Sequence, residues 1–276
     1  VRKHPPTFLP AVPPIYERLT AAAAEQGVSL EGISIAISGA MPLSASVVEP
    51  WEAKTGGYLV EGYGLSETSP VLMANPVATT RRAGTVGLPL PDTEVRVVDP
   101  DAPTLDVPAG ERGELVVRGP QVFSGYWNRP EETAEVFVDD PDGGAPWFRT
   151  GDIVTIDDGG FVRIVDRIKD VYISGGEQVA PAEVEEALRS HPAVDDVAVV
   201  GVPDSRWGET GQAWVVMRRG AVTDATELVA HARGVLAGFK VPRDIRFIDE
   251  IPRSMSGKVL RHVLAERARA ERETAR

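Results

Sequence analysis

The chain has 276 residues, with 41 Asp and Glu against 29 Lys and Arg, so its formal net charge is −12. This acidic balance argues against a nucleic-acid binder and against a clamp on an anionic membrane, because both need a surplus of Lys and Arg to neutralise phosphates. The absence of cysteine excludes disulfides, thiolate metal sites and a Cys nucleophile, and it fits a reducing cytosol. No run of about 18 apolar residues predicts a membrane span.

The first part of the chain predicts an α/β layer. Closely spaced prolines predict a loop up to residue 14, and the helix formers that follow predict a helix over Pro14–Ala24. The apolar run ISIAI, residues 33–37, predicts a buried strand that ends in a loop at Ser38. A second helix is predicted from about Ser44 to Lys54, where two glycines stop it. A further strand follows, and this order of elements is that of an α/β layer.

From Gly84 the sequence predicts short strands instead. The β-rich runs, separated by turn residues, are 94–99, 113–119, 152–157 and 161–166. Strands at this spacing favour a small barrel or sheet packed beside the α/β layer.

After Asp166 the pattern predicts a compact α+β unit. Its predicted strands are 171–176, 195–202, 211–218 and 244–249. Its predicted helices are 181–191, 226–238 and a charged tail helix, whose end at 266–276 we expect to fray in solvent. We place a boundary near Val165 to Asp170, which gives a domain over 1–165 and a smaller one over 166–276.

Polar residues gather at the ends of predicted elements. Ser38-Gly39-Ala40 ends a strand, where ligands bind in open α/β sheets, although a simple turn explains it as well. The loop 61–68 holds two glycines, an aromatic ring, two hydroxyls and a carboxylate, which suits a nucleotide with Mg²⁺ or, equally, a capped helix start. Neither 62–67 nor the SGK at 256–258 completes a dinucleotide or P-loop motif.

Three further charged residues have two interpretations each. Asp152 is a turn residue or a ligand of a polar substrate. Arg167 is a surface charge or a partner of a ribose or phosphate. Lys258, between a glycine and an apolar run, is a solvated lysine or a mobile cation that stabilises developing charge.

Seven motifs in order resemble the core motifs of the acyl-adenylate-forming enzymes, the superfamily of acyl-CoA synthetases, adenylation domains and firefly-type luciferases. They are SGAMPL, EGYGLSETSP, GTVGLPLP, GELVVRGPQVFSGYWNRPEETAEVF, WFRTGDIV, VDRIKDVYISGGEQVAPAEVEEAL and PRSMSGKVLRHVL. The resemblance covers about Pro5 to Ala265. It implies the C-terminal part of a large adenylating domain, made of the α/β layer and the β-rich subdomain, followed by a small mobile α+β domain.

The resemblance also implies a two-step reaction with ATP, Mg²⁺ and coenzyme A. A carboxylic acid and ATP give an acyl-adenylate and pyrophosphate, and the thiol of coenzyme A then displaces AMP. Residues matched to the adenine and the acyl carboxylate are Gly39, Ala40, Met41, Gly62, Tyr63, Gly64 and Leu65, with Tyr63 stacked on the base. Ser66 would touch phosphate and Glu67 would hold Mg²⁺.

The remaining roles implied by the resemblance involve the later motifs. Asp152 would accept the ribose hydroxyls with help from Arg167, and Lys258 would bridge the carboxylate and the α-phosphate. Lys169 lies at the hinge position, near 166–170. Residues matched to coenzyme A are Ser174, Gly175 and Gly176 at the pantetheine tunnel, Trp207 and Phe239 as aromatic contacts, and Arg243 near the phosphates; for the last three, ordinary packing competes with this interpretation.

Departures from the family pattern narrow the expected function. Gly64 stands where acetate-specific members carry Trp, which favours a pocket open to longer chains, and Ile173 counts against a luciferase. The upstream phosphate loop is absent, so we expect a C-terminal portion that is inactive alone. The leading expectation is a medium- or long-chain fatty-acyl-CoA ligase, in the cytoplasm, with peripheral membrane contact allowed. The alternatives are an aryl-CoA ligase or a truncated nucleotide- or CoA-binding module.

Overall fold

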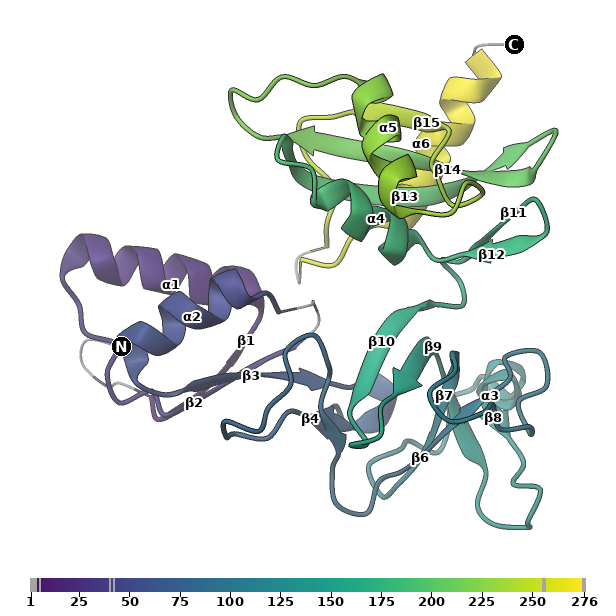
Figure 1. Ribbon diagram of the computed structural model, residues 1–276. Helices are drawn as coiled ribbons and strands as arrows, with labels where there is room; N and C mark the ends of the chain where they lie inside the picture. The colour runs from purple at the N-terminus through teal and green to yellow at the C-terminus, as the bar shows by residue number, and fades with distance from the viewer. Residues whose placement is uncertain (1–3, 5, 40, 42, 255–256, 275–276) are drawn as a thin grey trace. The chain divides into compact units, whose positions relative to one another are not determined.

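The computed structural model describes residues 4, 6–39, 41, 43–254 and 257–274 (Figure 1). The chain divides into two compact units, Val1–Ile164 and Val165–Arg276. Strand β10 (Val162–Arg167) runs across this division. Among the helices of the described residues, none is both long and apolar enough to cross a membrane.

Unit 1 begins with a five-stranded sheet in the order β1-β2-β3-β4-β5, whose first three strands are parallel. The strands are β1 (Phe8–Ala11), β2 (Ile35–Ser38), β3 (Tyr58–Tyr63), β4 (Met73–Ala74) and β5 (Leu88–Pro89). Helices α1 (Pro13–Gln26) and α2 (Ala45–Thr55) lie along one face of β1–β3 (Figure 1). Their core is built on an edge-to-face contact of Tyr16 and Trp51, with ring centroids 4.8 Å apart.

The prediction of a loop before residue 14 was wrong for Phe8–Ala11, which pairs in parallel with β2. This strand lies at the edge of its sheet. Pro10 is compatible with that position, because an edge strand leaves every second N–H without a partner strand. Local composition therefore favoured a loop, while pairing with β2 stabilises a strand.

A second sheet of unit 1 has the order β10-β9-β7-β6, with β8 paired to β9. Its elements are β6 (Glu94–Val98), β7 (Gly113–Arg118), β8 (Phe137–Val138) and β9 (Trp147–Ile156), and the short helix α3 (Pro130–Val136) precedes β8. Leu115, Val117 and Phe148 of this sheet pack in one core with Tyr63 and Met73 of the first sheet. This shared core brings the end of β3 next to β9.

Unit 2 is an α+β layer around the long antiparallel pair β13 (Val194–Asp204) and β14 (Gly208–Met217). The hairpin β11 (Tyr172–Ser174) and β12 (Glu177–Val179) joins one side of β14, and β15 (Asp244–Phe247) pairs in parallel with it. The helices are α4 (Pro181–Arg189), α5 (Ala225–Val235) and α6 (Arg261–Thr274).

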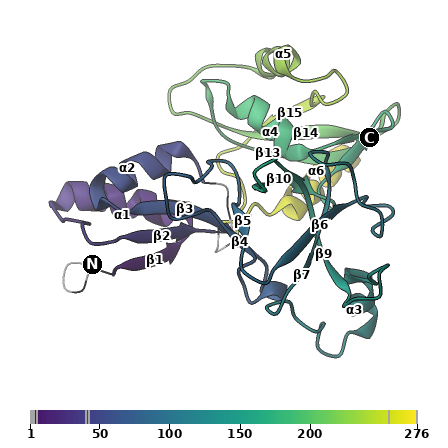
Figure 2. The ribbon, with the colours of Figure 1, turned by 60° about the horizontal axis from the view of Figure 1, so that its bottom comes forward.

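Alternation along β13 produces two cores, one on each face of the sheet. Val197 and Val199 pack under α4 and α5, whereas Ala198, Val200 and Val202 pack under α6. Figure 2 shows α6 and the pair α4 and α5 on opposite sides of this sheet. The predicted combination of an α/β layer, a β-rich part and an α+β unit is confirmed, and the charged tail continues a helix that begins at Arg261.

Candidate functional site

The ends of β2 and β3 form the first predicted site in unit 1. Their parallel register pairs Ser38, the last residue of β2, with Glu61, so the end of β2 lies beside the last part of β3. The hydroxyl of Ser38 is fully buried and has no hydrogen-bond partner among the described residues. A buried hydroxyl in this state is a group that a ligand could satisfy. Met41 is half-buried, whereas Ala40 lies outside the described residues.

Glu61 is a half-buried carboxyl that sequence reasoning did not single out. It lines a mostly apolar cavity of about 210 Å³ with Leu43, Val48 and Leu59, and with Arg81 among the polar lining residues. Burial raises the pKa of Glu61 to about 7, against the lowering effect of the Leu43 backbone N–H and the charge of Arg163. The Glu61 carboxyl on β3 therefore contacts the backbone at Leu43, shortly before α2 begins.

We expect the stability of unit 1 to fall as pH rises through the titration of Glu61. The folded pKa is raised above the unfolded one, so the stabilising contribution is fully present below about pH 4.5 and is lost as pH rises through about 7. In Glu61→Gln this loss should vanish, leaving the variant more stable than the parent at pH 8 by on the order of 3 kcal/mol at most. The melting temperature measured from pH 4 to 8 tests this.

The matched control is Glu25→Gln, because Glu25 is exposed on α1. Its melting temperature should follow that of the parent at every pH. Parallel curves for Glu61→Gln and the parent from pH 4 to 8 would contradict the prediction.

The loop after β3 is a tightly hydrogen-bonded turn. The Thr68 hydroxyl accepts from the Leu65 N–H at 2.9 Å and caps the 3-10 helix Ser66–Thr68. A Cβ on Gly64 would lie 1.6 Å from the carbonyl oxygen of Pro70, so the return of the loop itself requires glycine here. Ser66 is exposed at the surface of this loop. Both sequence-based interpretations of the segment, a ligand loop and a capped helix start, are thus compatible with its geometry.

Tyr63 and Asp152 are brought into direct contact. The Tyr63 hydroxyl donates to Asp152 Oδ2 at 2.5 Å, and both side chains are buried. Asp152 lies inside β9, so the interpretation of a simple turn residue was wrong. Its strand is irregular here, because the β7–β9 register shifts between Glu114 and Val116. Two residues assigned to the nucleotide therefore share one polar contact.

Glu67 has an unforeseen partner in Tyr126. The Tyr126 hydroxyl donates to Glu67 Oε1 at 2.9 Å, and the Phe123 N–H donates to the Glu67 carbonyl at 2.8 Å. The carboxylate is half-buried, and its oxygens are the hard ligands that Mg²⁺ prefers. Among the described residues no cluster of three His, Asp or Glu side chains could hold a metal by itself. Glu67 therefore fits an ion held by one carboxylate and substrate phosphates.

In unit 2, Arg167 and Lys169 lie on the turn between β10 and β11. The Asp170 N–H donates to the Arg167 carbonyl at 3.0 Å, and Lys169 is exposed. The neighbouring Asp166 is buried, and its carboxylate accepts from the Arg167 N–H at 2.6 Å and the Ala182 N–H at 3.4 Å. Burial raises the pKa of Asp166 to about 6, against these two hydrogen bonds. The carboxyl thus links the turn to the start of α4.

Lys258 is exposed on the loop that leads into α6. The Lys258 N–H donates to Ser254 Oγ at 3.2 Å, and the Ser254 N–H donates to the Lys258 carbonyl at 2.8 Å. These two bonds hold the Lys258 backbone against Ser254, and the Lys258 side chain is exposed.

The residues assigned to coenzyme A only partly come together. The Gly175 N–H donates to the Trp207 carbonyl at 2.8 Å, and a Cβ on Gly175 would lie 2.6 Å from the Trp207 ring. The guanidinium of Arg243 lies over the same ring, 4.3 Å from its centroid. The buried hydroxyl of Ser174 has no partner among the described residues. Phe239, in contrast, packs against the core beneath α4 and α5.

Sequence reasoning missed side-chain contacts that join distant segments. Tyr126, Glu61 and Arg261 all lie inside the quoted motifs but were given no role. No local pattern could have found them, because each acts through a residue in another element.

Two family models match the chain. The model of the AMP-binding enzyme family matches residues 1–127, and that of the AMP-binding enzyme C-terminal domain matches residues 183–258. The class defined by fold and motifs is thus that of the AMP-binding enzymes. The chain belongs to the acyl-adenylate-forming superfamily.

Two curated relatives and one solved structure illustrate the similarity. The long-chain-fatty-acid–CoA ligase of Bacillus subtilis is 44% identical over 266 residues, which is 96% of this chain and 46% of the relative. The feruloyl-CoA synthase of Amycolatopsis is 41% identical over 92% of this chain and 50% of the relative. ATP-bound MatB from Rhodopseudomonas palustris is 38% identical, with a TM-score of 0.82 over 94% of this chain and 50% of MatB. The chain spans about half the length of these proteins.

Proposed function

We propose that the chain provides part of an ATP-dependent acyl-CoA ligase for fatty acids of medium or long chain. The observation that carries the proposal is the buried contact between Tyr63 and Asp152, with Glu67 on the loop that follows Tyr63, within a chain of this superfamily. The similarity to a long-chain-fatty-acid–CoA ligase at 44% identity supports the acyl class.

In the first step a carboxylate oxygen of the acid bonds to the α-phosphorus of ATP. The bond between the α- and β-phosphates breaks, and pyrophosphate leaves. Asp152 would accept the ribose hydroxyls, and the Tyr63 hydroxyl, already bonded to Asp152, fixes that carboxylate. Lys258 and Arg167 supply positive charge to the phosphate as negative charge develops there. Mg²⁺ on Glu67 would neutralise phosphate charge.

In the second step the sulfur of coenzyme A bonds to the acyl carbon. The bond from that carbon to the AMP oxygen breaks, AMP leaves, and the thiol proton passes to solvent. Trp207 and Arg243 would contact the nucleotide end of coenzyme A, because a stacked guanidinium and indole offer both a flat surface and a charge. Ser174 would hydrogen-bond the pantetheine arm.

An aryl acid is the second candidate substrate. The feruloyl-CoA synthases that match 92% of the chain favour it. Since the relatives are about twice as long, the residues that select the acid need not all lie in this chain.

The experiment is pyrophosphate exchange with a panel of acids from acetate to palmitate, together with benzoate and ferulate. The chain is assayed alone and fused to the part of the Bacillus subtilis relative that it does not match. We expect exchange only from the fusion, with decanoate or longer acids. A fusion that exchanges ferulate and no fatty acid favours the aryl candidate, and one that exchanges no acid contradicts the proposal.

We expect Trp207→Ala to weaken coenzyme A binding without affecting adenylation. Loss of the ring that contacts Arg243 and the Gly175 backbone should raise the KM for coenzyme A roughly tenfold, about 1.4 kcal/mol. Pyrophosphate exchange should stay within about twofold of the parent, because exchange does not use coenzyme A. Trp127→Ala is the matched control, since Trp127 is 90% exposed in unit 1. Equal losses in both assays would contradict the coenzyme A role.

A further inference from the structure

The loop that carries Lys258 closes on itself before α6 begins. The Leu260 N–H donates to the Pro252 carbonyl at 2.9 Å, and the Gly257 N–H donates to the Ser254 carbonyl at 2.8 Å. These bonds join the two ends of the loop. The position of Lys258 therefore depends on what holds the base of the loop.

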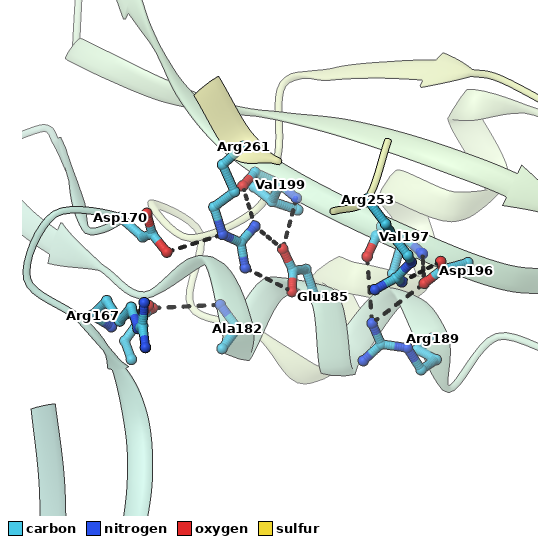
Figure 3. Close-up of polar contacts among 11 residues, drawn as sticks. Arg167, Asp170, Ala182, Glu185, Arg189, Asp196, Val197, Val199, Arg253 and Arg261 are labelled. Atoms are coloured by element: carbon cyan, nitrogen blue, oxygen red, sulfur yellow. Dashed lines mark hydrogen bonds and ion pairs between the residues drawn. The ribbon is translucent and has the colours of Figure 1, made fainter. Parts of the chain in front are cut away.

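Arg261, the first residue of α6, holds that base through three partners (Figure 3). Its guanidinium donates to both oxygens of Glu185 on α4, at 3.2 Å for the Nη2 bond, and to the Val199 carbonyl on β13 at 2.9 Å. Its Nε donates to Asp170 Oδ2 at 3.1 Å. The Arg261 guanidinium thus donates hydrogen bonds through its Nε and both of its Nη atoms.

The surroundings of this guanidinium are mostly buried. Glu185 is 7% exposed and also accepts from the Val199 N–H at 2.8 Å. Burial lowers the pKa of Arg261, but the Glu185 bond and the charges of Glu185 and Asp170 outweigh it and raise the pKa above the ordinary value. Arg261 and Glu185 therefore form a charged ion pair whose orientation is set by its hydrogen bonds. Breaking a buried ion pair of this kind is costly, because it leaves a buried charge without a partner.

Asp170 connects this network to the turn that carries Arg167. The Asp170 and Val171 N–H groups both donate to the Arg167 carbonyl, at 3.0 and 3.2 Å. Figure 3 shows Arg261 bonded to Asp170 on one side and to Glu185 on the other. The base of the Lys258 loop and the Arg167 turn, 91 residues apart in sequence at Arg261 and Asp170, are thereby joined within unit 2.

We propose that Arg261 is a positioning residue for adenylation, which holds the base of the Lys258 loop against α4 and β13 so that the Lys258 ammonium meets the phosphate in one place. The inference rests on the proposed function. Arg261 touches no substrate in this scheme and acts through Lys258. Lysine could not replace it, because an ammonium ion lacks the planar fork that reaches Glu185, Val199 and Asp170 together.

The test is a double-mutant cycle of Arg261→Lys and Lys258→Ala in the fusion with the Bacillus subtilis segment, read by pyrophosphate exchange. We expect Arg261→Lys to lower the exchange kcat roughly tenfold when Lys258 is present, with little change in the KM for ATP. In the Lys258→Ala background the same change should cost less than about twofold. A merely structural role would lower exchange equally in both backgrounds, and that result would overturn the inference.

A second variant tests the proposal in case Arg261→Lys does not fold. Asp170→Asn removes only the carboxylate that links to the turn, on a side chain that is partly exposed, and should lower exchange about threefold in the same Lys258-dependent way. Arg189→Lys is the matched control, because Arg189 is half-exposed at the end of α4, the helix that carries Glu185, and contacts Val197 and Asp196 instead. It should change exchange by less than about twofold. Additive behaviour of Asp170→Asn with Lys258→Ala also overturns the inference.

Failure of the proposed function and failure of the positioning role of Arg261 give different experimental results. If Lys258→Ala leaves exchange by the fusion unchanged, the role of Lys258 in the proposed function is wrong. If Lys258→Ala lowers exchange but Arg261→Lys and Asp170→Asn act independently of it, only the positioning role is wrong.

Discussion

Replacing Lys258 by Ala should lower pyrophosphate exchange roughly 10²- to 10³-fold, because it removes a cation from the phosphate at the moment when negative charge develops. The side chain is exposed, so the melting temperature should be unchanged. Exchange by the fusion and thermal unfolding of the chain measure the two effects separately. Lys258→Arg should lose less activity than Lys258→Ala, since it keeps the charge.

The control for this prediction is Lys54→Ala, an exposed lysine in the last turn of α2. It changes the net charge by the same amount at a distance from the assigned residues. Exchange by Lys258→Ala within about twofold of that of Lys54→Ala would show that Lys258 has no part in adenylation.

Replacing Gly64 by Ala should have the largest effect on stability and on the nucleotide loop. The new Cβ would lie 1.6 Å from the Pro70 carbonyl oxygen and 2.9 Å from the Val71 Cα, and both are backbone atoms that cannot turn away. The loop must move as a whole, at a cost of about 3 kcal/mol. Chemical denaturation of the chain measures this cost. We also expect AMP affinity to fall, because the displaced loop begins at Tyr63.

Gly234→Ala is the matched control. Gly234 lies in α5, and a Cβ there would meet no atom within 4 Å. Alanine is the better helix former, so this variant should be unchanged or more stable by up to about 1 kcal/mol. If the two variants unfold at the same denaturant concentration, the loop around Gly64 accepts a Cβ without cost. That result would contradict the inference that the loop requires glycine at position 64.

The presence of glycine at position 64 has two explanations. From the sequence, glycine in place of the tryptophan of acetate-specific relatives favours an open acyl pocket. The structure adds that the loop itself needs glycine, because Pro70 passes so close. The glycine is therefore no independent sign of chain length, and the acid panel decides that question.

The sequence by itself determined the superfamily, the combination of an α/β layer with an α+β unit, and most helices and strands. These features follow from apolar periodicity, turn residues and motif order, which are all local in the chain. The strand Phe8–Ala11 was not predicted, because the prolines in and around it favour a loop unless a neighbouring strand pairs with it.

Only the tertiary structure decided which side chains meet. Tyr63 and Asp152 are 89 residues apart in sequence, Glu67 and Tyr126 are 59 apart, and Asp170 and Arg261 are 91 apart. The raised pKa values of Glu61 and Asp166 have the same origin, since burial is a property of packed elements and not of neighbours in the chain. Local patterns named the residues able to do chemistry, and the packing of strands and helices assigned their partners.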